Sequence, residues 1–171
     1  MPFTRRMATA VRTVRIRRFA AAFLDGLLAL TIALVPAALA SPFGGPVQSR
    51  VFGIGLLFGT LYLLLRDAIP YAEWGARSLG KRWLGVRPFT IDGDPMDWRT
   101  SVRRNATVAA AFGIPAVAYV IGGHRGIPFG QVLLYGALAV AAIEAVLASV
   151  DVEGARLGDR WAGTRVTEAR A

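Results

Sequence analysis

The sequence predicts an all-α membrane protein with four transmembrane helices, cytoplasmic N- and C-termini and an interfacial cytoplasmic loop. Hydrophobic residues make up 54% of the chain and charged residues 18%, and the mean hydropathy is +0.47. These values exceed what a water-facing surface usually permits. Four long segments are nearly uncharged, and lysine and arginine gather in alternate segments between them. We therefore expect lipid to be part of the solvent.

Each apolar segment is long enough to span, because about 20 helical residues cover a hydrocarbon core of about 30 Å. Helix is the expected structure, since lipid cannot satisfy backbone N–H and C=O groups and four strands could not close a barrel. The expected spans are residues 19–40, 51–69, 106–123 and 129–150.

The third span is short and is expected to extend inward through residues 98–105, with Asp97 as its N-cap. Arg103 and Arg104 are expected to run their aliphatic stems along the helix and hold their charges at the headgroups.

The distribution of basic residues predicts the orientation. The basic start, residues 1–18, the loop, residues 70–105, and the tail, residues 151–171, together hold 17 Lys or Arg residues, whereas the other two connections hold only Arg50 and Arg125. Basic residues favour the cytoplasmic side. The chain therefore divides into a cytoplasmic N-terminus, a four-helix membrane domain at 19–150 and a cytoplasmic tail.

A cleaved signal peptide is an alternative for the first span, since a basic start and an apolar run precede Ala38-Leu39-Ala40. The run is longer than a usual signal core and contains Asp25. Cleavage would leave the other three spans oriented as before.

Two carboxylates are expected at one depth in the membrane, about 10 Å below the cytoplasmic face: Asp25 in the first span and Glu144 in the fourth. A carboxylate in lipid requires a proton or a cationic partner. Asp25 is expected to meet Arg66 or a water-filled pocket. Arg18 is expected to meet an acidic group of a cytoplasmic loop or the tail. These charges either fix helix register and depth, or bind and relay a proton or small cation.

The cytoplasmic loop contains Gly75 to Arg82, which has the glycine and lysine spacing of a phosphate-binding loop but an Arg where the metal-binding Ser or Thr belongs. We therefore favour an interfacial segment that contacts anionic lipid headgroups. Residues 92–95 are expected to turn the chain and close a short hairpin. The residues expected to contact lipid are Lys81, Arg82, Trp83, Arg87 and Trp98.

Small residues recur at helix-packing spacing, as at Gly55 and Gly59, and at Ala137, Ala141 and Ala145. This spacing favours contacts inside the bundle, and a homo-oligomer or a membrane-protein partner is the alternative. No basic recognition element for nucleic acid is present in the sequence. With no cysteine and no grouped nucleophile, base and orienting residue, we expect no enzyme, metal site or cofactor.

Three ordered motifs resemble the RDD family of bacterial membrane proteins, named for one arginine and two aspartates. The first runs from Arg18 to Asp25, the second from Ser78 to Val86, and the third from Asp159 to Thr164. Ala76 and Gly158 depart from the family pattern, which often has Gly and His at these positions. The missing histidine weakens any proposal of His-assisted proton transfer.

The resemblance implies a role in transport, and some members of the family are proposed to exchange sodium for protons. We therefore expect a transport-related protein of the bacterial inner membrane with a polar cluster near its inner face. The alternative is a non-catalytic scaffold or accessory subunit that binds another membrane protein. The residues expected in the cluster are Arg18, Asp25, Arg66, Glu144 and Asp159.

Overall fold

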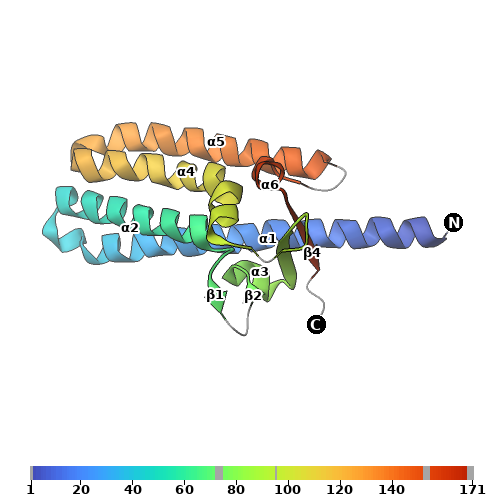
Figure 1. Cartoon of the computed structure of the whole chain (residues 1–171). Helices are drawn as coiled ribbons and strands as arrows, with labels where there is room; N and C mark the ends of the chain where they lie inside the picture. The colour runs from blue at the N-terminus through green and yellow to red at the C-terminus, as the bar shows by residue number, and fades with distance from the viewer. Residues whose placement is uncertain (1, 72–74, 95, 152–154, 169–171) are drawn as a thin grey trace. The chain divides into compact units, whose positions relative to one another are not determined.

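A computed structural model describes residues 2–71, 75–94, 96–151 and 155–168. Figure 1 shows a mostly helical chain. Its elements, in chain order, are α1 (Pro2–Leu39), η1 (Ser41–Phe43), α2 (Gly45–Leu65), β1 (Pro70–Tyr71), β2 (Gly75–Ala76), α3 (Leu79–Trp83), β3 (Val86–Thr90), α4 (Trp98–Gly122), η2 (Gly123–Gly126), α5 (Ile127–Val150), α6 (Leu157–Ala162) and β4 (Thr164–Glu168).

Within the described part of the chain, four helices are long and apolar enough to cross a membrane, as predicted. They are Thr13–Leu39, Gly45–Leu65, Trp98–Gly122 and Ile127–Val150. The second begins six residues earlier than expected and ends before Arg66. The first belongs to a longer helix, because α1 also includes most of the basic N-terminal segment.

The third span extends inward as predicted. The backbone N–H of Thr100 donates to Asp97 Oδ1 at 2.7 Å, so Asp97 caps the first turn of α4. Hydrogen bonds from the side chain and from the backbone N–H of Thr100 lower the pKa of Asp97. Pro115 lies within α4, which continues through it.

The chain forms two compact units. The first, here called the polar unit, comprises Met1–Asp25, Leu65–Arg104 and Glu144–Ala171; the second, the apolar unit, comprises Gly26–Leu64 and Asn105–Ile143. Only two charged residues, Arg50 and Arg125, fall in the apolar unit. All the other charged residues of the sequence belong to the polar unit.

In the apolar unit, α1 and α2 approach through small residues. A Cβ on Gly55 would lie 2.5 Å from Ala33 Cα, and one on Gly59 would lie 2.7 Å from the carbonyl oxygen of Ala29. Such glycines let helix backbones approach closely where lipid supplies no hydrophobic driving force. The prediction of small-residue packing inside the bundle is therefore confirmed for these two glycines.

Aromatic packing completes the core of the apolar unit. Tyr119 of α4 is buried, lies edge-on to Phe52 at a centroid distance of 5.2 Å, and packs with Ala33 and Leu56. A Cβ on Gly130 would lie 2.8 Å from the Tyr119 ring. The ring therefore contacts α2 and α5 residues of this unit.

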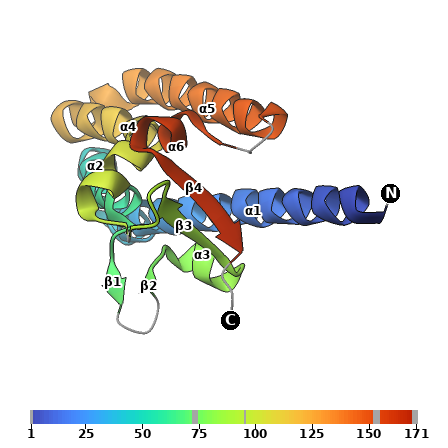
Figure 2. The ribbon, with the colours of Figure 1, turned by 45° about the vertical axis from the view of Figure 1, so that its right-hand side comes forward.

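The polar unit contains β-structure that the all-α prediction missed. Strand β3 pairs with β4 in antiparallel register from Val86↔Glu168 to Thr90↔Thr164, and Figures 1 and 2 show the two strands side by side. β1 pairs with β2. The predicted local hairpin is wrong, because the partner of β3 comes from the C-terminal segment. The chain does turn after β3, where the N–H of Gly93 donates to the carbonyl of Thr90 at 3.0 Å.

The β3–β4 ribbon has one buried face. Val86, Pro88 and Thr164 are buried, whereas Arg87 and Arg165 are exposed on the other face. This alternation is that of a ribbon with one side packed on a core. In the same unit, Arg15 of α1 donates to the carbonyls of Ser149, at 3.1 Å, and Asp151, which ties α1 to the end of α5.

Candidate functional site

A network of buried charges is the main feature of the polar unit. Every buried charged side chain among the described residues belongs to this unit, and together they comprise five basic and four acidic groups. Burying a charge is costly unless it is paired and hydrogen-bonded. The members of this network are Arg18, Asp25, Arg66, Asp67, Lys81, Arg104, Glu144, Arg156 and Asp159.

Asp25 joins α1 to two other segments. Its Oδ2 lies 3.2 Å from Arg66 Nη1, in the turn that follows α2, and its Oδ1 accepts a hydrogen bond from the N–H of Gly80 at 3.0 Å. The Gly80 backbone reaches Asp25 because it lies against α1. A Cβ on Gly80 would lie 2.3 Å from the carbonyl oxygen of Ala21. The predicted pairing of Asp25 with Arg66 is confirmed.

Asp67 forms the centre of a second group of ion pairs. Its carboxylate binds Lys81 Nζ and lies 3.7 Å from Arg104 Nη1. Ser78 caps α3 by accepting the N–H of Lys81 at 3.4 Å, which helps to fix the start of that helix.

The charges around Asp67 control its protonation. Burial alone would raise its pKa, but Lys81, Arg104 and Arg66 together hold the pKa well below its usual range. Asp67 is therefore an ionised carboxylate at neutral pH. Burial lowers the pKa of Lys81, and the attraction of Asp67 opposes that effect.

Asp159 gathers three guanidinium groups. Arg104 Nε lies 2.9 Å from Oδ1, Arg156 Nε lies 3.7 Å from Oδ2, and Arg18 Nη2 binds Oδ2. The same oxygen accepts the backbone N–H of Arg156 at 2.9 Å, so Asp159 also caps the first turn of α6. The prediction that Arg18 meets an acidic group of the tail is confirmed.

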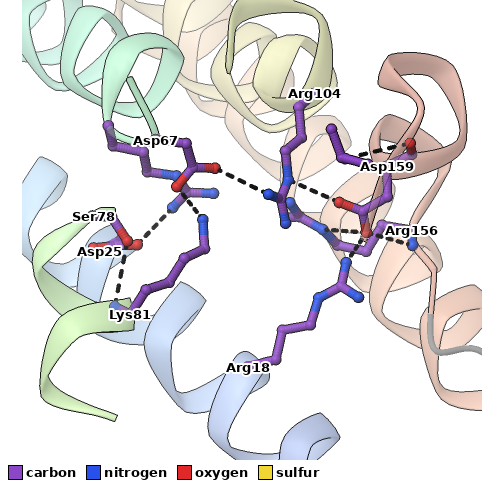
Figure 3. Close-up of polar contacts among 10 residues, drawn as sticks. Arg18, Asp25, Asp67, Ser78, Lys81, Arg104, Arg156 and Asp159 are labelled. Atoms are coloured by element: carbon purple, nitrogen blue, oxygen red, sulfur yellow. Dashed lines mark hydrogen bonds and ion pairs between the residues drawn. The ribbon is translucent and has the colours of Figure 1, made fainter. Parts of the chain in front are cut away.

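Arg104 links the two groups, since it contacts both Asp67 and Asp159. Figure 3 shows its guanidinium between the two carboxylates, with Arg18 reaching Asp159 from α1. Gly158 permits the close approach of α6 to α4, because a Cβ there would lie 2.0 Å from the carbonyl oxygen of Arg104. The network thus connects α1, α3, α4 and α6.

Glu144 is buried near the end of α5. Burial and the charges of Arg104 and Arg66 lower the pKa of Arg156 to about 10, and Glu144 opposes that shift. Glu144 is thus electrostatically coupled to the Asp159 group. All five residues predicted for the polar cluster belong to the network.

Sequence reasoning missed four members of the network, which are Asp67, Lys81, Arg104 and Arg156. Arg104 was expected at the headgroups, but its side chain is buried and ion-paired. The available signal for Asp67 was its place beside Arg66, directly after an apolar span. Arg156 lies three residues before Asp159, which is the spacing of a helix cap and its partner.

The predicted lipid contacts divide into two groups. Lys81 is wrongly assigned to the lipid, because its side chain is buried and binds Asp67. The four other predicted residues have exposed side chains, as a headgroup contact requires: Arg82, Trp83, Arg87 and Trp98.

Four helices that are long and apolar enough to span a bilayer indicate a membrane protein. The model of the RDD family matches residues 13–169, nearly the whole chain, and the protein belongs to that family. In the structure, Arg18 of the first resembling motif pairs with Asp159 of the third. No curated protein and no solved structure gives a significant match.

Proposed function

We propose that this RDD-family protein is a transport-related protein of the bacterial inner membrane, coupled to an ion or proton, with its N- and C-termini in the cytoplasm. The bias of basic residues supports this orientation. The proposal assigns the protein no catalytic reaction and no cofactor. The buried network is the proposed ion-contact site.

The observation that supports this role is the burial of several ionisable groups within the spans. Asp25, Arg104 and Glu144 lie inside candidate spans and are nearly inaccessible. Ionisable side chains are costly in lipid and commonly mark ion or proton paths. In a polar unit at the inner face, such groups would meet ions that arrive from the cytoplasm.

The test is a flux assay in proteoliposomes. Purified protein is reconstituted into liposomes, and a pH or sodium gradient is imposed across their membrane. The decay of that gradient is followed with a pH- or sodium-sensitive dye. We expect wild-type protein to dissipate one gradient faster than empty liposomes, and we expect Asp25→Asn and Glu144→Gln, measured separately, to slow that flux.

Asp94→Asn is the matched control, because Asp94 is exposed and outside the network. Circular dichroism and gel filtration establish that each variant is folded. Equal flux with wild type and both folded network variants would contradict the proposed role of the network.

A scaffold or accessory subunit is the second candidate. It is favoured by α5, whose large apolar side chains, such as Phe129, Tyr135 and Ile143, are exposed along the helix. A membrane-protein partner or a second copy could cover this face as well as lipid does. Wild-type protein that moves neither protons nor sodium would favour this candidate.

The exposed Arg82, Trp83, Arg87 and Trp98 support contact with anionic lipid headgroups on the cytoplasmic side. Tryptophan favours the membrane interface, and arginine binds phosphate groups. Lipid contact is compatible with either candidate function.

A further inference from the structure

The buried network carries an excess of positive charge. Among the described residues, five buried basic side chains face four buried acidic ones. The excess is concentrated at Asp159, where Arg18, Arg104 and Arg156 share one carboxylate. A buried group with more cations than anions attracts an anion.

Arg104 supplies a second observation. Its Nη1 lies near Asp67 and its Nε near Asp159, but the buried Nη2 has no hydrogen-bond partner among the described residues. An unsatisfied donor on a buried guanidinium is unfavourable, so an acceptor is expected there. An anion beside Nη2 would provide that acceptor and reduce the excess charge.

The three guanidiniums at Asp159 are not equally buried. Arg18 and Arg156 each keep 8% of their surface exposed, whereas Arg104 is 1% exposed. Guanidinium groups match the spacing of phosphate oxygens and form paired, charge-assisted hydrogen bonds with them.

We propose that Arg18, Arg104 and Arg156 bind a phosphate group beside Asp159, in the network of the polar unit. This inference goes beyond the proposed function, because the ligand that it assigns to the network is an anion, whereas the proposed flux is of protons or sodium. The phosphate group is supplied either by free inorganic phosphate or by the headgroup of an anionic lipid.

Two binding arms distinguish the sources. In the first, delipidated full-length protein in detergent is dialysed against radiolabelled inorganic phosphate, and bound phosphate is counted. In the second, the protein is placed in nanodiscs of phosphatidylcholine with or without phosphatidic acid, and its thermal midpoint is measured. Binding in the first arm identifies free phosphate. A higher midpoint with phosphatidic acid, without binding in the first arm, identifies a lipid headgroup.

Arg156→Lys is the principal variant, because it keeps the charge and removes the planar fork. We expect it to weaken binding by about tenfold or more, the usual effect of losing a hydrogen bond to a charged group. Arg165→Lys is the matched control, since Arg165 is exposed on β4 and outside the network. Arg18→Lys replaces the principal variant if Arg156→Lys does not fold.

Absence of binding in both arms, or equal binding by wild type and the folded lysine variant, would overturn the inference. The flux assay tests the proposed function separately from the binding experiments. Phosphate binding without proton or sodium flux would leave the anion site and remove the cation-transport proposal. Proton or sodium flux without phosphate binding would support the proposed function and overturn the anion site.

Discussion

Gly158 permits a close approach of α6 to α4 in the polar unit. A Cβ at this position would lie 2.0 Å from the carbonyl oxygen of Arg104, which belongs to the backbone of a long helix and cannot turn aside. The departure from the family pattern at this position therefore has a packing consequence. A histidine here would require α6 to lie further from α4.

We expect Gly158→Ala to destabilise the protein by about 1–3 kcal/mol, the usual cost of overpacking a filled site. The measurement is the thermal unfolding midpoint of the detergent-solubilised protein. Gly136→Ala is the control, because nothing lies within 4 Å of a Cβ at Gly136. An unchanged midpoint for Gly158→Ala would show that α6 does not pack against Arg104 in this way.

Asp67 makes stability depend on pH in the acid range. Its folded-state pKa lies below the ordinary value of about 4 for an unfolded aspartate, so the unfolded chain takes up a proton first as the pH falls. The stabilising contribution of its charge is thus complete above about pH 5 and decreases below about pH 4.

We expect the unfolding midpoint of Asp67→Asn to be lower than that of wild type at pH 7 and to change less between pH 5 and pH 3. The exposed Asp92→Asn variant serves as the control and should follow the wild-type curve. The same acid sensitivity in Asp67→Asn and wild type would assign the effect to other carboxylates.

At the scale of elements, the β3–β4 ribbon joins the cytoplasmic loop to the C-terminal segment. Arg87 is paired directly with Thr167, and both side chains are exposed. Residues opposite each other in an antiparallel pair have Cα atoms about 4.5–5.5 Å apart, within the range of a disulfide. The sequence contains no cysteine that could interfere.

We expect the double variant Arg87→Cys with Thr167→Cys to form an intramolecular disulfide on mild oxidation, detected by intact mass and by a gel shift on reduction. Arg87→Cys with Arg165→Cys is the control, because these positions are offset by two residues and lie beyond disulfide reach. Efficient cross-linking of the control pair instead would mean that the register is different.

The sequence predicted the spans well because lipid imposes a long apolar run on each one. It also offered Arg66 as one of two alternatives for the partner of Asp25, since both charges were expected near the cytoplasmic ends of their spans. Lys81 was misassigned because Lys81-Arg82-Trp83 has the local composition of an interfacial segment. Only the structure shows that the Lys81 side chain binds Asp67.

The β3–β4 pairing was not predictable from either strand alone. Each strand has five residues, and two membrane spans separate them in the sequence. Alternation over so few positions also fits a loop, and the register depends on where the tail returns. Arg104 was missed for a similar reason, because Asp159, its partner, lies beyond the fourth span.

At the scale of the whole molecule, charge is divided between the two units, with Arg50 and Arg125 as the charged residues of the apolar one. We expect single-cysteine variants to report the orientation that this division implies. In right-side-out vesicles, an impermeant maleimide should label Ser41→Cys directly and Thr167→Cys only after permeabilisation. The two positions are exposed, in η1 and β4 respectively. The opposite labelling pattern would reverse the proposed topology.

The ion pair between Arg18 and Asp159 sets an order for biogenesis. The ribosome makes Arg18 near the start of the first span and Asp159 after all four spans. The first helix therefore enters the translocation machinery while its arginine still lacks this carboxylate, and α6 must return to the helix bundle after insertion. The Arg18–Asp159 pair can therefore form only after the fourth span has been translated.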